Sequence, residues 1–238
     1  YLFNENTRLR QRDEKNSKDK TMAQWSFLGP VEAEGGYSGL GRVNCVITDP
    51  NNSNILWAGG ASGGLWKSPD AGNNWYLITD ELPSIGVTDI AINPLNTNIM
   101  YIATGDGFAA SCHSAGVMKS TNGGSSWNTT GLNWNVSQTR RIYRLLINPQ
   151  NPSELYAATS AGVYKTTNDG EDWNRVLSGN FKDMEFKPRN YETIYAATNS
   201  SGVFKTTDAG ANWTELSNGL PANGYNRIAL GVTPADSD

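Results

Sequence analysis

The stretch Ser68-Pro69-Asp70-Ala71-Gly72-Asn73-Asn74-Trp75 occurs in four versions along the 238-residue sequence. The shared pattern is Ser or Thr, any residue, Asp or Asn, any residue, Gly, two further residues and Trp. A hydroxyl and a short carboxylate or amide can bond the backbone of a tight turn, and glycine adopts a positive φ there at little cost. The tryptophan starts the outgoing strand and folds back over the turn. The pattern therefore predicts four β-hairpins with one type of turn.

The four key positions of the pattern are filled by the same kinds of residue in each version. They are Ser68, Asp70, Gly72 and Trp75; Ser120, Asn122, Gly124 and Trp127; Thr166, Asn168, Gly170 and Trp173; and Thr206, Asp208, Gly210 and Trp213. Because these side chains serve the turn itself, we interpret them as structural residues.

The repeating unit is longer than the turn. A short strand of the form Gly-apolar-x-Lys, such as Gly64-Leu65-Trp66-Lys67, precedes each turn, and an apolar strand precedes that one. A proline turn and a further apolar run come first, at residues 43–48, 87–92, 142–147 and 181–186. Four short strands thus recur every 40 to 50 residues or so, which is typical of one propeller blade per repeat.

These motifs resemble the Asp-box, or bacterial neuraminidase repeat. That repeat is found in sialidases, in two-propeller xyloglucan-cleaving glucanases, in sortilin-type receptor propellers and in photosystem assembly factors. The resemblance covers residues 24–238 and implies an all-β propeller with four-stranded antiparallel blades. It implies little about function, because in those families the box lies on the rim, away from the ligand site.

We predict two regions. Residues 1–23 form a charged arm, weakly helical or disordered by composition, with a leader or docking segment as the alternative. Residues 24–238 form blades 1 to 4 and the start of blade 5, since residues 227–234 match an inner strand and its proline turn. Residues 24–29 resemble an outer strand and would complete the last blade. Unpaired strand edges favour aggregation, so we interpret the chain as the N-terminal part of a larger ring.

Composition narrows the class of partner. There are 19 basic and 23 acidic residues, a net charge of −4 and a pI near 5.1, which argues against nucleic acid as a ligand. The sequence contains no run of 18 apolar residues, so we predict no membrane span. The single histidine, His113, has no companion cluster, so we expect neither a metal nor a cofactor. Cys45 and Cys112 could pair across neighbouring blades in an oxidising compartment, or Cys45 could be a small core residue.

Two loops on the predicted top face are longer than their equivalents, at residues 105–114 and 131–139. Insertions on a rigid scaffold are where binding residues tend to lie. Aromatic side chains beside Arg and Asp could stack on a sugar or hold a peptide; alternatively, the two loops simply pack on each other. The candidate binding residues are Arg42, Asp106, Phe108, His113, Trp134, Arg140 and Arg141, with Tyr37 at the same rim.

Aligned on their proline turns, the inner strands place one residue each at an equivalent position facing the channel. These residues are Cys45, Asp89, Arg144, Asp183 and Ala229. The order Asp, Arg, Asp on consecutive blades predicts charge pairing around the channel. A carboxylate pair for glycoside cleavage is the alternative.

Neither enzyme family that the motifs resemble is matched at its catalytic residues, so we assign none. Arg42 is followed by Val43-Asn44 rather than the Ile-Pro of sialidases. The xyloglucan-cleaving enzymes carry a first catalytic Asp in Thr-Asp-x-Gly-Gly, and Ala61 stands at that position here.

The sequence therefore favours a secreted or cell-surface propeller, a binding or scaffold module of a larger extracellular protein. It would recognise protein or glycan through the top-face loops, and a secretion or surface-complex partner fits the resemblance to proteins exported by the type IX route. The alternative is a glycoside hydrolase acting on extracellular glycans. A third class, an assembly chaperone, would need a basic channel, for which Arg42, Arg141 and Arg227 give the one indication.

Overall fold

The computed structural model describes residues 41–79, 82–84, 86–109, 112–199, 202–217, 219 and 227–234. All of them belong to one compact unit, Ala33–Asp238. The arm predicted at residues 1–23, the strand predicted at residues 24–29 and Tyr37 lie outside the described residues.

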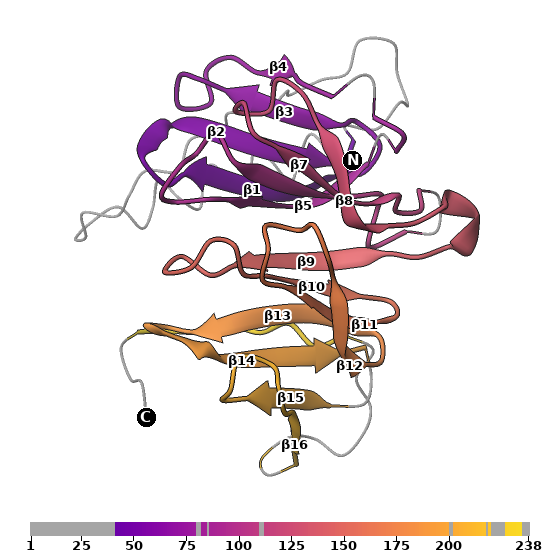
Figure 1. The fold of residues 1–238 in the computed structure, drawn as a ribbon. Coiled ribbons are helices and arrows are strands. Elements are labelled where there is room, and N and C mark those ends of the chain that lie inside the picture. Colours follow the sequence, from indigo (N-terminus) through magenta and orange to yellow (C-terminus); the bar gives the residue numbers. More distant parts are fainter. Residues whose placement is uncertain are drawn as a thin grey trace, which may run out of the picture. The chain divides into compact units, whose positions relative to one another are not determined.

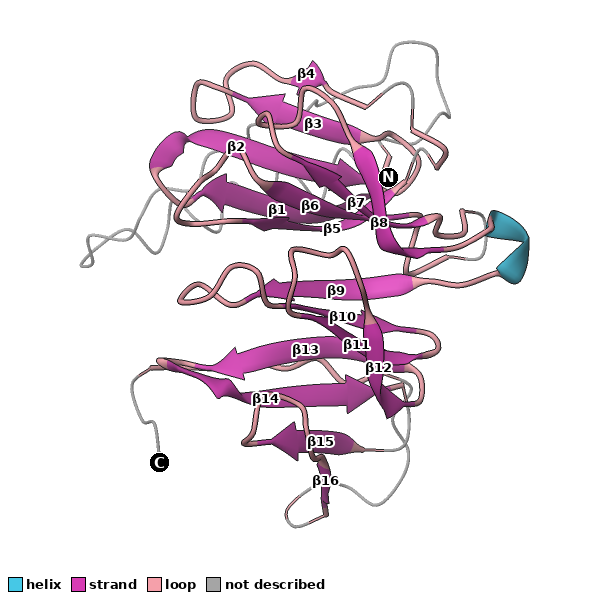
Figure 2. Cartoon of the chain, in the orientation of Figure 1, coloured by secondary structure: helices cyan, strands magenta, loops and turns pink. Residues whose placement is uncertain are grey.

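Four antiparallel sheets follow one another along the chain, and each is a meander of four strands in sequence order (Figure 1). This confirms the predicted all-β class and the four-stranded blades. The strands are β1 (Val43–Asp49), β2 (Asn52–Gly60), β3 (Leu65–Ser68) and β4 (Tyr76–Leu77); β5 (Val87–Ile92), β6 (Met100–Thr104), β7 (Gly116–Ser120) and β8 (Asn128–Asn133); β9 (Ile142–Ile147), β10 (Leu155–Thr159), β11 (Gly162–Thr166) and β12 (Asn174–Ser178); and β13 (Phe181–Lys187), β14 (Asn190–Thr198), β15 (Val203–Thr206) and β16 (Thr214–Leu216). In the described part, one 3-10 turn, η1 (Val136–Gln138), links blades 2 and 3 (Figure 2).

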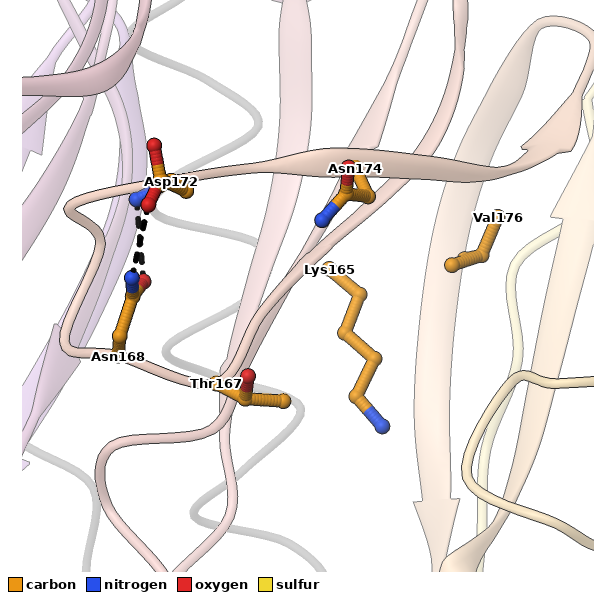
Figure 3. Close-up of a pocket in the computed structure, with 6 residues that line it drawn as sticks. All are labelled: Lys165, Thr167, Asn168, Asp172, Asn174 and Val176. Atoms are coloured by element: carbon orange, nitrogen blue, oxygen red, sulfur yellow. Dashed lines mark hydrogen bonds between the residues drawn. The ribbon is translucent and has the colours of Figure 1, made fainter.

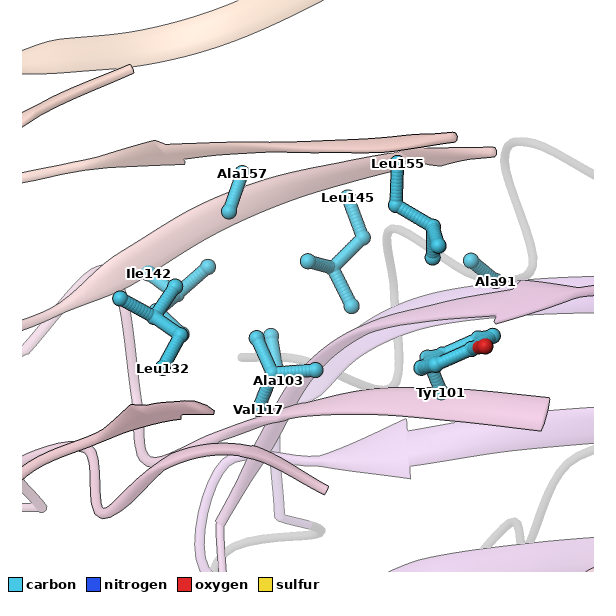
Figure 4. Packing of buried hydrophobic residues seen from close by; sticks show 9 residues of the cluster. All are labelled: Ala91, Tyr101, Ala103, Val117, Leu132, Ile142, Leu145, Leu155 and Ala157. Atoms are coloured by element: carbon cyan, nitrogen blue, oxygen red, sulfur yellow. The ribbon is translucent and has the colours of Figure 1, made fainter. Parts of the chain in front are cut away.

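Consecutive blades pack face to face through their first two strands, with β5 between β1 and β9, and β9 between β5 and β13. Side chains alternate between the two faces of a strand, so each one faces either the preceding or the following blade. In β10, Leu155 and Ala157 join the core shared with blade 2, whereas Tyr156 and Ala158 join the core shared with blade 4. Figure 4 shows the first of these cores, with side chains from blades 2 and 3 meeting between the sheets. Both faces of blades 2 and 3 are covered in this way, and every residue of β5 and β6 is buried.

The turn motif bonds in the same way in all four blades. In blade 1, Ser68 Oγ donates to Asp70 Oδ1 at 2.9 Å and accepts from the Gly72 amide at 2.8 Å, while Asp70 Oδ1 accepts from the Asn74 amide at 2.8 Å. The hydroxyls of Ser120, Thr166 and Thr206 accept from Gly124, Gly170 and Gly210 in turn. In blade 4, Asp208 accepts hydrogen bonds from the backbone and side chain of Asn212 and from the Thr206 hydroxyl. These bonds lower the pKa of Asp208 to about 2.

The turn needs two successive residues with positive φ, of which the pattern marks only the glycine. The residue before the glycine is Ala71 at 58°, Gly123 at 65°, Asp169 at 60° or Ala209 at 54°. A left-handed conformation costs a non-glycine residue about 1 kcal/mol or more. The side-chain bonds on either side of this residue hold the turn in that shape.

The turns of blades 2, 3 and 4 also receive a side chain from the blade before them. Tyr101 of β6 donates its hydroxyl to the carbonyl of Asp169 at 3.1 Å, and Tyr156 of β10 donates to that of Ala209 at 2.8 Å. Both acceptors are the positive-φ residues of the next blade's turn. In blade 1 the equivalent residue is Trp57, whose ring lies against Gly124. The turn is therefore a contact between blades as well as a hairpin closure.

The tryptophans of the four turns differ in burial. Trp173 packs partly buried against the core between blades 2 and 3, whereas Trp75 is 36% exposed and donates Nε1 to the Gly72 carbonyl at 3.1 Å. We expect Trp173→Ala to lower the free energy of unfolding by about 2–3 kcal/mol, below the range for a fully buried tryptophan. Trp75→Ala should cost less. Urea unfolding of both variants measures the difference, and equal losses would contradict this account of Trp173.

One sequence expectation needs correction, and the structure decides between the two alternatives left open for the cysteines. Residues 227–234 form no strand in the structure, although the amide of Leu230 donates to Asp183 on β13. An inner strand is held by pairing with the second strand of its blade, and no described segment supplies one here. Cys45 and Cys112 are both free. The Cys45 thiol packs beside Gly59, and burial raises its pKa to about 12, while Cys112 Sγ lies 3.3 Å from Ser84 Oγ.

Candidate functional site

Every inner strand carries a β-bulge at its second residue. The pairing of β9 with β10 passes from Ile142 to Arg144 and skips Tyr143, and the other three blades do the same. A bulge bends the strand and re-aims the extra side chain. The skipped residues are Asn44, Thr88, Tyr143 and Lys182.

All four bulge residues line a single pocket, together with the residue that follows each of them. In a regular strand, Tyr143 and Arg144 would face opposite sides of the sheet. The bulge lets both reach the same space, which has a volume of about 290 Å³. The full lining is Asn44, Cys45, Thr88, Asp89, Phe108, Tyr143, Arg144, Lys182, Asp183, Glu185, Arg227 and Leu230.

Charge pairing across the blades confirms the predicted Asp, Arg, Asp series. Arg144 lies 3.9 Å from a carboxylate oxygen of Asp89 and 3.9 Å from one of Asp183. Its shortest bond is to Glu185 Oε1 at 2.6 Å, a partner that the alignment of strands did not identify. One guanidinium thus serves three carboxylates from two strands, β5 of blade 2 and β13 of blade 4.

The two aspartates also join the blades through the backbone. Asp89 accepts from the amide of Ile90 at 3.0 Å and from that of Leu145 in the next blade at 2.7 Å. Asp183 repeats this arrangement with the amides of Met184 and Leu230. Burial raises the pKa of Asp89 to about 6, against the opposing effect of Arg144. Burial likewise raises the pKa of Glu185.

The loop at residues 105–109 brings Phe108 to the pocket. Arg42 pairs with Asp106, whose side chain is 1% exposed, and Asp106 Oδ1 accepts from the Phe108 amide at 3.0 Å. On the opposite side, the Arg227 guanidinium lies 4.5 Å from the centre of the Phe108 ring. Arg42 and Asp106 therefore position the loop, while Phe108 is 38% exposed and accessible to a ligand.

The other predicted site residues do not line this pocket. Trp134 packs on Tyr164 with ring centres 6.2 Å apart, as a packed loop would. The backbone of Arg140 accepts from Ser114, and that of Arg141 pairs with Ser160. The Nδ1 atom of His113 is buried without a partner in the described part of the chain.

A second pocket, of about 380 Å³, lies beside the turn of blade 3 (Figure 3). Three of its polar side chains, Lys165, Asn168 and Asp172, already have partners within the protein. Asn168 and Asp172 bond each other at 3.0 Å, as the dashed lines show. The Lys165 ammonium donates to the Ala209 carbonyl at 2.8 Å and lies 3.4 Å from Glu154. We interpret this pocket as part of the blade architecture.

Two general features bear on the class of protein. Among the described residues, no helix is long and apolar enough to cross a membrane. Within the same ranges, no group of three or more His, Cys, Asp or Glu side chains is placed to hold a metal ion.

The comparisons with known proteins agree with this fold. No family model matches the sequence. A xyloglucanase from Hypocrea jecorina (strain QM6a) is 46% identical over 52 residues, which is 21% of this chain and 6% of that protein. An ancestral GH74 enzyme has a TM-score of 0.63 and 25% identity, covering 76% of this chain and 24% of that one.

Two further solved structures share the fold at lower identity. The GH74 xyloglucanase from Xanthomonas campestris has a TM-score of 0.62 and 19% identity, covering 76% of this chain and 31% of its own. An auxiliary nutrient binding protein from Bacteroides thetaiotaomicron has a TM-score of 0.51 and 14% identity, covering 70% of this chain and 38% of its own.

With its four turn motifs and four blades, the chain is an Asp-box β-propeller, similar to part of the larger propellers of GH74 xyloglucanases. It spans about a quarter to a third of the length of these GH74 enzymes and a far smaller part of the curated xyloglucanase.

Proposed function

We propose that this chain is part of a secreted or cell-surface propeller that binds a glycan without cleaving it. The observation that carries the proposal is the convergence of four bulge residues and Phe108 on one pocket. Exposed aromatic surface beside hydrogen-bonding side chains is the chemistry that holds a sugar ring. The xyloglucanases among the similar proteins act on a glycan, and one similar structure is described as nutrient binding.

The state of the carboxylates favours binding over hydrolysis. Glycoside cleavage needs one carboxyl group free to donate a proton and a second free to attack or to activate water. Both oxygens of Asp89 face backbone amides, as do both oxygens of Asp183. Glu185 is bound to Arg144. Ala61, which stands where the xyloglucan-cleaving enzymes carry an aspartate, is buried and has no carboxylate to offer.

Hydrolysis is the second candidate, and the similarity to xyloglucanases favours it. The raised pKa of Asp89, about 6, would suit a proton donor. Its side chain is only 7% exposed, however, and lies 3.9 Å from Arg144. We therefore expect no release of reducing ends from xyloglucan. If reducing ends are released and Glu185→Gln abolishes their release, the function is hydrolysis and not binding alone.

Binding is tested by passing the full chain over immobilised polysaccharides, both neutral ones such as xyloglucan and acidic ones. Phe108→Ala should weaken retention about tenfold, because it removes the exposed ring at the pocket. The matched control is Tyr76→Ala, which removes an aromatic residue that is 56% exposed and does not line the pocket. No retention on any polysaccharide, or equal losses in the two variants, would contradict the proposal.

A further inference from the structure

The pocket contains three carboxylates and three cationic side chains, but they differ in what they contact. Asp89, Asp183 and Glu185 all share Arg144, and the two aspartates also accept backbone amides. Their side chains are 7%, 20% and 22% exposed. The negative charge is therefore held at the floor of the pocket by bonds within the protein.

Lys182 and Arg227 have no such partners. Neither forms an ion pair with any described residue. Instead, the Lys182 ammonium lies 3.7 Å from the centre of the Tyr143 ring, and the Arg227 guanidinium 4.5 Å from that of Phe108. A ring face attracts a cation but leaves its N–H donors free for a ligand. The charges that remain available to a ligand in this pocket are thus positive.

We propose that the pocket binds a glycan that carries carboxylates, with Lys182 and Arg227 as the residues that hold a carboxylate. This inference rests on the proposed function and names its ligand class. Arg and Lys form charge-assisted bonds to carboxylates, and these are about twice as strong as neutral hydrogen bonds. Phe108 supplies the apolar contact for the sugar ring.

The size of the pocket fits one sugar unit. Its volume of about 290 Å³ lies just below the usual range for small-molecule sites. The bulge residue Lys182 and the Arg227 side chain come from neighbouring segments joined by the bond between Asp183 and Leu230. That bond fixes the two segments relative to each other before a ligand arrives, which lowers the entropic cost of bringing the two cations together.

The test compares two ligands that differ at the carboxyl group alone: a galacturonate oligosaccharide, which is charged, and its neutral methyl ester. We expect calorimetry with the full chain to show at least about tenfold tighter binding of the acid than of the ester, and less binding of the acid in high salt. Lys182→Gln should reduce affinity for the acid about tenfold and leave that for the ester unchanged. Arg227→Gln should behave in the same way.

Lys205→Gln is the matched control. Lys205 lies 5.7 Å from the Tyr195 ring in a similar contact but does not line the pocket, so its loss should leave acid binding unchanged. Equal affinity for acid and ester would overturn this inference while supporting glycan binding. If a glutamate-rich peptide binds and neither oligosaccharide does, the assignment of a glycan as the ligand is wrong. An unchanged affinity of Lys182→Gln and Arg227→Gln for the acid would remove these two residues from the site.

Discussion

Tyr156→Ala is expected to lower the free energy of unfolding by about 3–5 kcal/mol, the range for deleting a large buried aromatic side chain. Tyr156 is fully buried between blades 3 and 4 and donates its hydroxyl to the carbonyl of Ala209. The alanine variant would leave a cavity in that core and remove a bond to the next blade's turn. Guanidinium unfolding followed by tryptophan fluorescence measures the loss.

Two controls separate the ring from the hydroxyl. Tyr156→Phe keeps the ring but removes the hydroxyl, which contacts both Glu154 and the Ala209 carbonyl. Lys165 still contacts both of these groups, so we expect a loss of only about 1–2 kcal/mol. Tyr195 occupies the equivalent position in blade 4, where it is only partly buried and its hydroxyl has no bond to a described turn. Tyr195→Ala should therefore cost clearly less. If Tyr156→Ala and Tyr195→Ala unfold at the same denaturant concentration, the proposed role of the contact between blades is wrong.

Asp89→Ala is the second change with a large expected effect. It should lower the free energy of unfolding by about 2–4 kcal/mol at pH 4–5. It leaves the buried amides of Ile90 and Leu145 without their acceptor, and each such group costs about 1–3 kcal/mol. The matched variant Asp183→Ala loses equivalent bonds at a side chain that is 20% rather than 7% exposed. Water can replace more of the lost bonds there, so the loss should be smaller.

The cost of Asp89→Ala should also depend on pH. The folded-state pKa of Asp89 is about 6, above its ordinary value of 3.8. The folded chain therefore binds this proton more tightly than the unfolded chain does, which stabilises the fold. That stabilisation is fully present below pH 4 and is lost as the pH rises through 6. A shift of this size corresponds to roughly 3 kcal/mol. The variant should thus lose less stability at pH 7 than at pH 4, and a cost independent of pH would contradict the role of burial.

Much of the blade could be predicted from sequence, because two strong local signals coincide. The apolar runs that precede the proline turns located the inner strands, and β5 and β9 have the predicted bounds. The turn motif located the hairpins, since the side chains of Ser68 and Asp70 act within a few residues of themselves. The pairing of Arg144 with Asp89 followed from aligning equivalent strands.

The pocket was harder to predict because its shape depends on an irregularity. Alternation alone places Tyr143 and Lys182 on the face away from the channel, and only the bulge brings them to it. The bulge depends on the pairing of whole strands, which no short motif encodes. Loop length was a weaker guide, since Trp134 of the long second loop packs on Tyr164 instead. The one available signal was that the residue before each channel position varies from Asn to Thr, Tyr and Lys.

That variation has a consequence for how such a protein can change its ligand. A bulged residue is outside the regular pairing of its strand, so its side chain can be exchanged without breaking the ladder on either side. The hydrogen bonds that Asp89 accepts from the Leu145 amide and Asp183 accepts from the Leu230 amide stay in place whichever residue precedes each aspartate. Stability and selectivity are thus assigned to adjacent residues. A library that randomises only residues 44, 88, 143 and 182 would explore new specificities on an unaltered scaffold.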